Sequence, residues 1–131
     1  MKVLALDYGA ARTGVAISDA TGTLARPLTV VERAASEPGL RRLAELVATE
    51  GAERIVVGLP LTLKGDHGAQ ADETADFVAA LSAVVDVPVE SFDERFTTAL
   101  AASGPSSLSP EDARAAAHLL ESYLTWTSGN Q

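Results

Sequence analysis

The sequence predicts an α/β domain built on a five-stranded mixed sheet with helices on both faces. Residues 1–31 hold three apolar runs separated by very short turns, which indicates an antiparallel meander. Two further apolar runs alternate with segments of helical periodicity, a pattern that adds parallel strands to a sheet. The chain has 131 residues, so we expect a single domain over residues 1–131.

The strands are expected where apolar runs end at turn residues. The first covers residues 3–7 and the second residues 14–18, and the third follows a polar turn and covers residues 25–31. The segment ERIVVGLPL is apolar almost throughout, as in a strand with both faces covered. Residues 87–92 are expected to form a short fifth strand.

The first helix is predicted between Ser36 and Gly51. Ser36 can cap its start, Pro38 suits its first turn, and Gly51 can end it. The residues expected on its apolar face are Leu40, Leu43, Ala44 and Val47.

Further helices are predicted over residues 70–82, briefly near Thr97, and from Pro110 to about Trp126. The expected apolar stripe of the helix over 70–82 contains Ala71, Thr74, Ala75, Val78 and Leu81. Steps of ~100° along the last helix define a core-facing arc. Its members are Asp112, Ala116, Leu119, Leu120 and Tyr123. The opposite side contains Glu111, Arg114, His118 and Glu121.

The composition excludes several classes of protein. The absence of cysteine rules out a disulfide framework and a thiolate metal site. The net charge of −8 counts against a strong non-specific nucleic-acid binder, although a local basic groove is still possible. The N-terminus lacks a signal-peptide layout, and no apolar run approaches the ~18 residues of a membrane span. We therefore expect a cytoplasmic protein without membrane contact.

The first predicted strand ends in an acid, Asp7. An acid before a glycine turn often only hydrogen-bonds the turn backbone. In DYGAARTG, however, Gly9 and Gly14 flank Arg12, so a tight loop holds a cation beside the acid. This arrangement suits an anionic ligand held next to a metal ion.

A second acidic point lies in SFDERFTT. Asp93 and Glu94 end the fifth predicted strand, and Arg95 follows directly. The two acids could simply precede a helix capped by Thr97 or Thr98, where they would offset the helix dipole. Two adjacent acids and an arginine fit metal and phosphate chemistry equally well, so both interpretations stay open.

A third acid, Asp112, lies in SPEDARAAAHLLESYL. Ser109 is a plausible helix cap and Pro110 suits the first helical position, so Asp112 could be an ordinary N-terminal acid. It lies on or beside the core-facing arc, however, where a lone charge is costly. A bound metal ion would make it tolerable. His118 lies on the solvent side and is interpreted as a surface residue.

Three carboxylates from three separate elements suit hard divalent cations such as Mg²⁺ or Mn²⁺. Two such ions ~4 Å apart can activate a water molecule and stabilise the leaving oxygen in phosphodiester hydrolysis. The metal site is a hypothesis, because spacing in the sequence does not establish proximity in space.

Four segments of the chain together resemble the conserved blocks of one known family. They are LALDYGAARTGVAISD, IVVGLPLTLKGDHGAQA, VPVESFDERFTT and DARAAAHLLESYL. They are similar to the YqgF family of Holliday-junction-resolvase-like proteins, which are also described as nucleases that mature the precursor of 16S ribosomal RNA. The resemblance covers nearly the whole chain and is specific as a set, although each segment alone is a weak signal.

The resemblance implies a ribonuclease H-like fold and a metal-dependent nuclease with a carboxylate triad. Asp7 matches the acid of the first strand, Glu94 the acid of the DER block, and Asp112 the acid that opens the last helix. These three residues would hold Mg²⁺ or Mn²⁺, two ions when substrate is bound. The candidates for phosphate contact are Arg12, Lys64 and Arg95.

The chain departs from the family pattern in two places. Many relatives carry a basic stretch before the last helix, but AASGPSSLSP contains no base, so nucleic-acid contact there is in doubt. Many resolvase relatives add a fourth acid at the position of Ala115, so a three-acid site would bind its second metal ion weakly without substrate. The role of Asp93 stays open.

The leading interpretation is a hydrolase of phosphodiester bonds in structured nucleic acid. The first expected role is maturation of the 5′ end of precursor 16S ribosomal RNA, and the second is resolution of branched DNA. A resolvase that cuts two symmetric strands would need a dimer, so monomer and homodimer both stay open. The alternative of another class is a non-catalytic RNA-binding factor in ribosome biogenesis or transcription. An actin-type ATPase is disfavoured because it would need a second domain.

Overall fold

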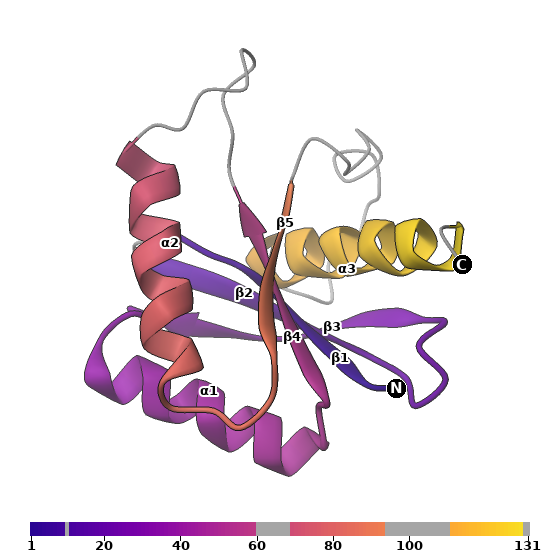
Figure 1. Cartoon of the computed structure of the whole chain (residues 1–131), viewed down its shortest axis with the longest axis horizontal. Helices are drawn as coiled ribbons and strands as arrows, with labels where there is room; N and C mark the ends of the chain where they lie inside the picture. The colour runs from indigo at the N-terminus through magenta and orange to yellow at the C-terminus, as the bar shows by residue number, and fades with distance from the viewer. Residues whose placement is uncertain (10, 60–68, 94–110, 130–131) are drawn as a thin grey trace.

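The computed structural model describes residues 1–9, 11–59, 69–93 and 111–129 (Figure 1). In chain order the elements are β1 (Val3–Asp7), β2 (Arg12–Ser18), β3 (Ala25–Glu32), α1 (Glu37–Glu50), β4 (Arg54–Leu59), α2 (Ala69–Ser82), β5 (Val89–Asp93) and α3 (Glu111–Gly129). The short helix expected near Thr97 lies outside the described residues.

The strands form one sheet in the order β3-β2-β1-β4-β5. β1, β2 and β3 are antiparallel neighbours, whereas β4 and β5 run parallel to β1. This topology confirms the predicted mixed sheet. It also gathers the last residues of β1, β4 and β5, the first residues of β2 and the last residues of β3 at one end of the sheet. We call this end the carboxyl end of the sheet.

Several strand boundaries differ from the prediction by one or two residues, including the ends of β3 and β5, which each lie one residue further on. β2 begins at Arg12 rather than at residue 14, because Arg12 and Thr13 pair with the end of β3. β5 begins at Val89 rather than at residue 87. Pro88 has no N–H to give to a ladder, and its carbonyl oxygen accepts a hydrogen bond from the N–H of Ile55 at 2.9 Å.

Side chains of the sheet alternate between two cores. The core under α1 and α2 includes Leu4, Leu6, Val15, Ile17, Leu43, Ile55, Val57, Phe77 and Leu81. The core under α3 includes Val3, Ala5, Ala16, Val56, Phe92, Ala116, Leu119, Leu120 and Tyr123. Figure 1 shows α3 on one face of the sheet and α1 with α2 on the other. Each fully buried large aliphatic side chain contributes about 1.5–3 kcal/mol, so both faces stabilise the fold.

The caps of α1 are confirmed. The hydroxyl of Ser36 accepts a hydrogen bond from the N–H of Gly39 at 3.2 Å. Gly51 adopts the left-handed conformation, with φ of 71°, and its N–H donates to the carbonyl of Val47 at 3.0 Å. Capping by a serine hydroxyl is worth ~1 kcal/mol, and glycine adopts positive φ without the strain of a side chain.

The buried faces of the first two helices are rotated slightly from the predicted stripes. In α1 the buried residues are Gly39, Leu43 and Leu46, while Leu40, Ala44 and Val47 are half-buried. In α2 the prediction omits Phe77, which is 1% exposed, and wrongly includes Ala75, which is exposed. Thr74, Phe77 and Leu81 follow the i, i+3, i+7 spacing of one helix face, and the large ring takes the central place.

The predicted core-facing arc of α3 is confirmed for the residues whose side chains are described. Ala116, Leu119, Leu120 and Tyr123 are buried. His118 is half-buried on the other side, and its Nδ1 lies 3.5 Å from Oε1 of Glu121. The helix extends to Gly129, slightly beyond the predicted end.

Candidate active site

Asp7 is the last residue of β1, at the carboxyl end of the sheet between β2 and β4. It pairs with Gly14 of β2, and its side chain is half-buried. Val3 and Ala5 belong to the core under α3. Because side chains alternate along a strand, Asp7 lies on this same face of the sheet.

The neighbouring strands end beside Asp7. Leu59 of β4 pairs with Asp93 of β5, and Gly58 pairs with Phe92. Since β1, β4 and β5 are parallel neighbours, the backbone positions of Asp7, Gly58 and Asp93 lie at adjacent strand ends. The sheet therefore brings together two of the three acidic segments that the sequence analysis singles out.

Several candidate residues fall outside what the structure describes. Glu94, Arg95 and Lys64 lie outside the described residues. The backbone of Asp112 belongs to the first turn of α3, and that of Asp93 ends β5, but their side chains are not among those described. The position of the predicted triad is thus fixed by the structure at Asp7 alone.

α3 lies on the face of the sheet that carries Asp7. Its C-terminal half is anchored at the other end of the sheet, because the hydroxyl of Tyr123 accepts a hydrogen bond from Arg54, the first residue of β4, at 3.1 Å. Figure 1 accordingly shows the last turns of α3 on the side of the chain's N-terminus. The first turn of α3, which contains the backbone of Asp112, lies toward the opposite end of the helix, away from the chain's N-terminus (Figure 1).

The loop after Asp7 is tight. A Cβ added at Gly9 would lie 2.5 Å from the carbonyl oxygen of Arg12, closer than any side chain tolerates. Thr13 is fully buried, and its hydroxyl lies 3.4 Å from both the N–H and the carbonyl oxygen of Gly9. The loop thus holds Arg12 at the start of β2, where its side chain is exposed.

The structure adds a cation that the sequence analysis missed. Arg33 follows β3, and its N–H donates to the carbonyl of Ala11 at 3.0 Å, so it lies beside the residue that precedes Arg12. Among the described residues it is the one non-glycine residue with positive φ, at 48°. This conformation costs an L-residue roughly 1–2 kcal/mol. The hairpin could have revealed the position, because antiparallel pairing brings the end of β3 to the start of β2.

The left-handed conformation of Arg33 is held from both sides. Its carbonyl oxygen accepts hydrogen bonds from the N–H of Ser36 at 2.9 Å and from the hydroxyl of Ser36 at 2.6 Å. A Cβ added at Gly39 would lie 2.2 Å from the same oxygen, so the first turn of α1 packs directly on it. The backbone of Arg33 is therefore fixed, while its side chain is exposed.

The donor set at the carboxyl end of the sheet fits a hard divalent cation. Asp7 offers carboxylate oxygen at a half-buried position, and Mg²⁺ and Mn²⁺ prefer such ligands. Within residues 1–9, 11–59, 69–93 and 111–129, no group of three or more metal-ligating side chains occurs. A complete metal site at Asp7 therefore needs acids from outside these ranges or from the turn that carries Asp112.

A groove of about 320 Å³ borders the end of β1 on the opposite face of the sheet. Tyr8 stacks on Phe77 there, with ring centroids 4.5 Å apart and an angle of 20° between the planes. Glu73 and Asp76 also line the groove. The pKa of the Tyr8 hydroxyl is raised, mainly by burial and to a smaller extent by the negative charge of Glu73. The negative wall makes this groove unfavourable for a phosphate backbone.

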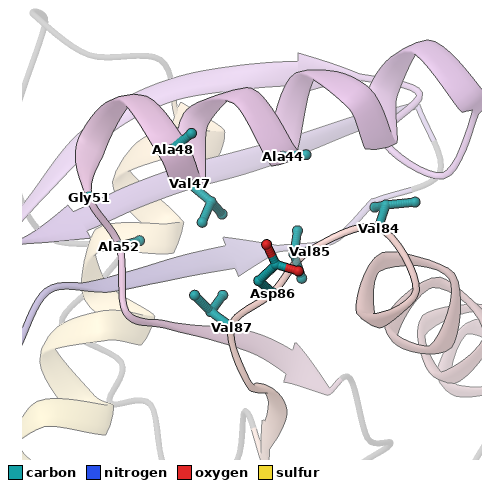
Figure 2. A pocket seen from close by; sticks show the side chains of 9 residues that line it. All are labelled: Ala44, Val47, Ala48, Gly51, Ala52, Val84, Val85, Asp86 and Val87. Atoms are coloured by element: carbon teal, nitrogen blue, oxygen red, sulfur yellow. The ribbon is translucent and has the colours of Figure 1, made fainter.

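A second hollow, of about 370 Å³, lies far from Asp7. Figure 2 shows its lining from α1 and the segment before β5. The lining residues are Ala44, Val47, Ala48, Gly51, Ala52, Val84, Val85, Asp86 and Val87. Gly51 and Ala52 precede β4, so this hollow lies at the other end of the sheet and takes no part in the candidate site.

The strand order and the helices on both faces of the sheet define a ribonuclease H-like fold. Thermus thermophilus RuvC in complex with a Holliday junction substrate superposes with a TM-score of 0.69 at 14% identity. The match covers 98% of this chain and 96% of that one. At this identity the likeness establishes the fold, which agrees with the expected ribonuclease H-like architecture.

The family is established by sequence. The family described as "RuvX: Holliday junction resolvase" matches residues 1–126, and the chain belongs to it. A relative from Chloroflexus aggregans, named "Putative pre-16S rRNA nuclease", is 43% identical over 93% of this chain and 92% of its own length. A relative of the same name from Rubrobacter xylanophilus is 43% identical over 98% and 95%. The resemblance to the YqgF family is confirmed, and the chain is a nuclease, a hydrolase of ester bonds.

No helix within the described ranges combines the length and apolar character that a membrane span requires.

Proposed function

We propose that this nuclease cuts phosphodiester bonds with the help of divalent metal and acts on precursor 16S ribosomal RNA at its 5′ end. The observation that carries the proposal is the half-buried carboxylate of Asp7 at the carboxyl end of the sheet, on the face covered by α3. The names of the relatives support the RNA substrate. Activity on ribosomal precursors would place the protein in the cytoplasm.

The roles of the side chains follow from their chemistry. Asp7, Glu94 and Asp112 would hold Mg²⁺ or Mn²⁺, two ions when substrate is bound. The metal would supply Lewis-acid stabilisation of charge and a water molecule of lowered pKa. Asp7 is partly withdrawn from solvent, so its negative charge acts on nearby cations more strongly than an exposed carboxylate would. Arg12, Lys64 and Arg95 would contact phosphate oxygens and fix the register of the nucleic acid.

The direct test is cleavage of precursor 16S ribosomal RNA, single-stranded RNA and a four-way DNA junction, with Mg²⁺ or Mn²⁺ and then with EDTA. Asp7→Asn keeps the shape of the side chain and removes its charge. Asp86→Asn is the matched control, since Asp86 is exposed at the far end of the sheet. We expect metal-dependent cutting by wild type and Asp86→Asn, and a loss of at least about 100-fold in Asp7→Asn, as for key charge-stabilising groups.

Two results would change the proposal. Preferred cutting of the four-way junction would favour resolution of branched DNA, the function that describes the RuvX family, and would call for a homodimer rather than a monomer. Equal traces of cleavage by wild type and Asp7→Asn would remove the nuclease proposal for these substrates. A non-catalytic RNA-binding role would then be favoured.

A further inference from the structure

We propose that Arg33 is a further substrate-binding residue, which contacts a backbone phosphate of the nucleic acid where it leaves the active site across β2 and β3. This inference deepens the proposed function and rests on it for the identity of the substrate. Arg33 lies between β3 and α1 and belongs to none of the four segments that resemble the family.

The position of Arg33 suits such a contact. Its N–H binds the carbonyl of Ala11, so the residue lies at the carboxyl end of the sheet, which Asp7 also occupies. Asp7 lies on β1 and Arg33 follows β3, two strands away, and neighbouring strands are ~4.8 Å apart. Two strand spacings amount to about 10 Å, so a nucleic-acid strand that runs from Asp7 toward β3 comes near Arg33 at a phosphate beyond the one that is cut.

The charges at this end of the sheet leave a role for Arg33. Arg12 is directly opposite Glu32 in the β2–β3 pairing, so these two side chains together add no net positive charge. Arg33 is the next residue along the chain and is exposed. Of the basic side chains in the part of the chain that the structure describes, those of Arg33 and Arg42 are the two without a recorded ion pair or hydrogen bond. Arg33 is thus available to an anionic ligand.

The backbone of Arg33 gives independent support. A positive φ at a residue other than glycine, asparagine or aspartate is strained, and such residues cluster at ligand-binding and active sites. Here the strain is held by the bonds to Ala11 and Ser36 and by the close packing of Gly39. A glycine would fit this conformation without strain. An arginine with a fixed backbone and an exposed guanidinium presents its charge at a defined place.

The test compares wild type with Arg33→Gln, Arg33→Gly, Arg33→Lys and Arg42→Gln. Binding of a fluorescent precursor 16S ribosomal RNA leader and of a four-way DNA junction is measured in EDTA over a range of salt concentrations. We expect Arg33→Gln and Arg33→Gly to bind roughly 5–10-fold more weakly at ~0.1 M salt, with the slope of log K against log salt reduced by ~0.7–0.9, the effect of one phosphate contact. Arg33→Lys should stay within about twofold of wild type, since it keeps the charge.

Arg42→Gln is the matched control, because it removes an exposed arginine from α1 that is equally without a recorded partner. Arg33→Gly guards against misfolding, since it removes the charge and relieves the strain together. The proposal is overturned if Arg33→Gln and Arg33→Gly bind like Arg42→Gln, or if wild type binds neither probe. If Asp7→Asn loses cleavage but Arg33→Gln binds like wild type, the role of Arg33 is refuted and the proposed function stands. If Arg33→Gln binds more weakly but wild type shows no metal-dependent cleavage, the role of Arg33 in binding stands and the proposed nuclease function is refuted.

Discussion

Replacement of Gly39 by alanine should destabilise the protein, although alanine normally favours a helix. In an exposed helix interior, alanine is better than glycine by up to ~1 kcal/mol. At Gly39 the added Cβ would lie 2.2 Å from the carbonyl oxygen of Arg33 and 2.6 Å from the Cα of Ala34. Ordinary contact begins near 3.4 Å, so the two backbones must separate by about 1 Å, a change of the size that overpacking imposes.

The backbone around Arg33 cannot yield easily. Its carbonyl oxygen accepts two hydrogen bonds from Ser36, the residue that also caps α1. Overpacking of this kind costs about 1–3 kcal/mol. With loss of the cap geometry added, we expect Gly39→Ala to lower the free energy of unfolding by about 2–3 kcal/mol. In urea this corresponds to a fall of about 1 M or more in the midpoint.

Gly51→Ala is the matched control for Gly39→Ala. Gly51 ends the same helix with φ of 71°, and a Cβ there would meet nothing within 4 Å. Its replacement should therefore cost only the left-handed strain, ~1 kcal/mol. Urea unfolding followed by circular dichroism, with an unchanged m-value, measures both variants. The reasoning is refuted if Gly39→Ala is as stable as wild type, or loses less stability than Gly51→Ala.

Two further predictions concern the dependence of stability on pH. Tyr123→Phe should cost about 1–2 kcal/mol at pH 7, because the hydroxyl contacts both Arg54 and Glu90. The pKa of Tyr123 is raised, first by burial and then by the hydrogen bond to Glu90. The contribution of its hydroxyl to stability is therefore complete below pH ~10 and is lost as pH rises through the raised pKa. The free energy of unfolding of Tyr123→Phe should accordingly fall less steeply at alkaline pH than that of wild type. The backbone N–H of Thr23 is the main cause that lowers the pKa of Asp19, whose contribution is present above pH ~4 and lost as pH falls toward the lowered pKa. Unfolding of Asp19→Asn across pH 2–7 should therefore show a weaker acid dependence than wild type, and equal dependence would contradict the assignment.

The parts of the fold that could be predicted are those encoded by local pattern. The apolar run that ends at Asp7 predicts β1, and Ser36 and Gly51 mark the ends of α1 within one residue. These signals are local because a strand alternates between faces, a serine caps with its own hydroxyl, and glycine adopts positive φ alone. The antiparallel pairing of β1, β2 and β3 follows from the short turns that connect them, whereas the place of β4 beside β1 comes from the structure.

The parts that could not be predicted depend on contacts between different elements of the fold. Nothing in the residues around Gly39 indicates that the carbonyl of Arg33 packs on it, because this contact arises only when α1 folds back on the end of β3. The omission of Phe77 from the predicted stripe has a related cause. Phe77 is buried in the core that the sheet forms with α1, and Tyr8 stacks on it from the loop after β1. The left-handed φ of Arg33 is likewise imposed by Ala11 and Ser36 rather than by its own side chain.

The distribution of charge around Asp7 reconciles a net charge of −8 with nucleic-acid binding. Charges more than ~10 Å apart are largely screened at physiological salt, so a ligand at Asp7 responds to its immediate neighbours. On the face of α2 these neighbours are Glu73 and Asp76, which repel phosphate. Toward β2 and β3 the charge of Arg12 is offset by Glu32 opposite it, and the exposed guanidinium of Arg33 attracts phosphate. The two sides of the carboxyl end of the sheet are thus unequal, and a phosphate backbone that passes Asp7 has one favourable direction, across β2 and β3 and away from α2.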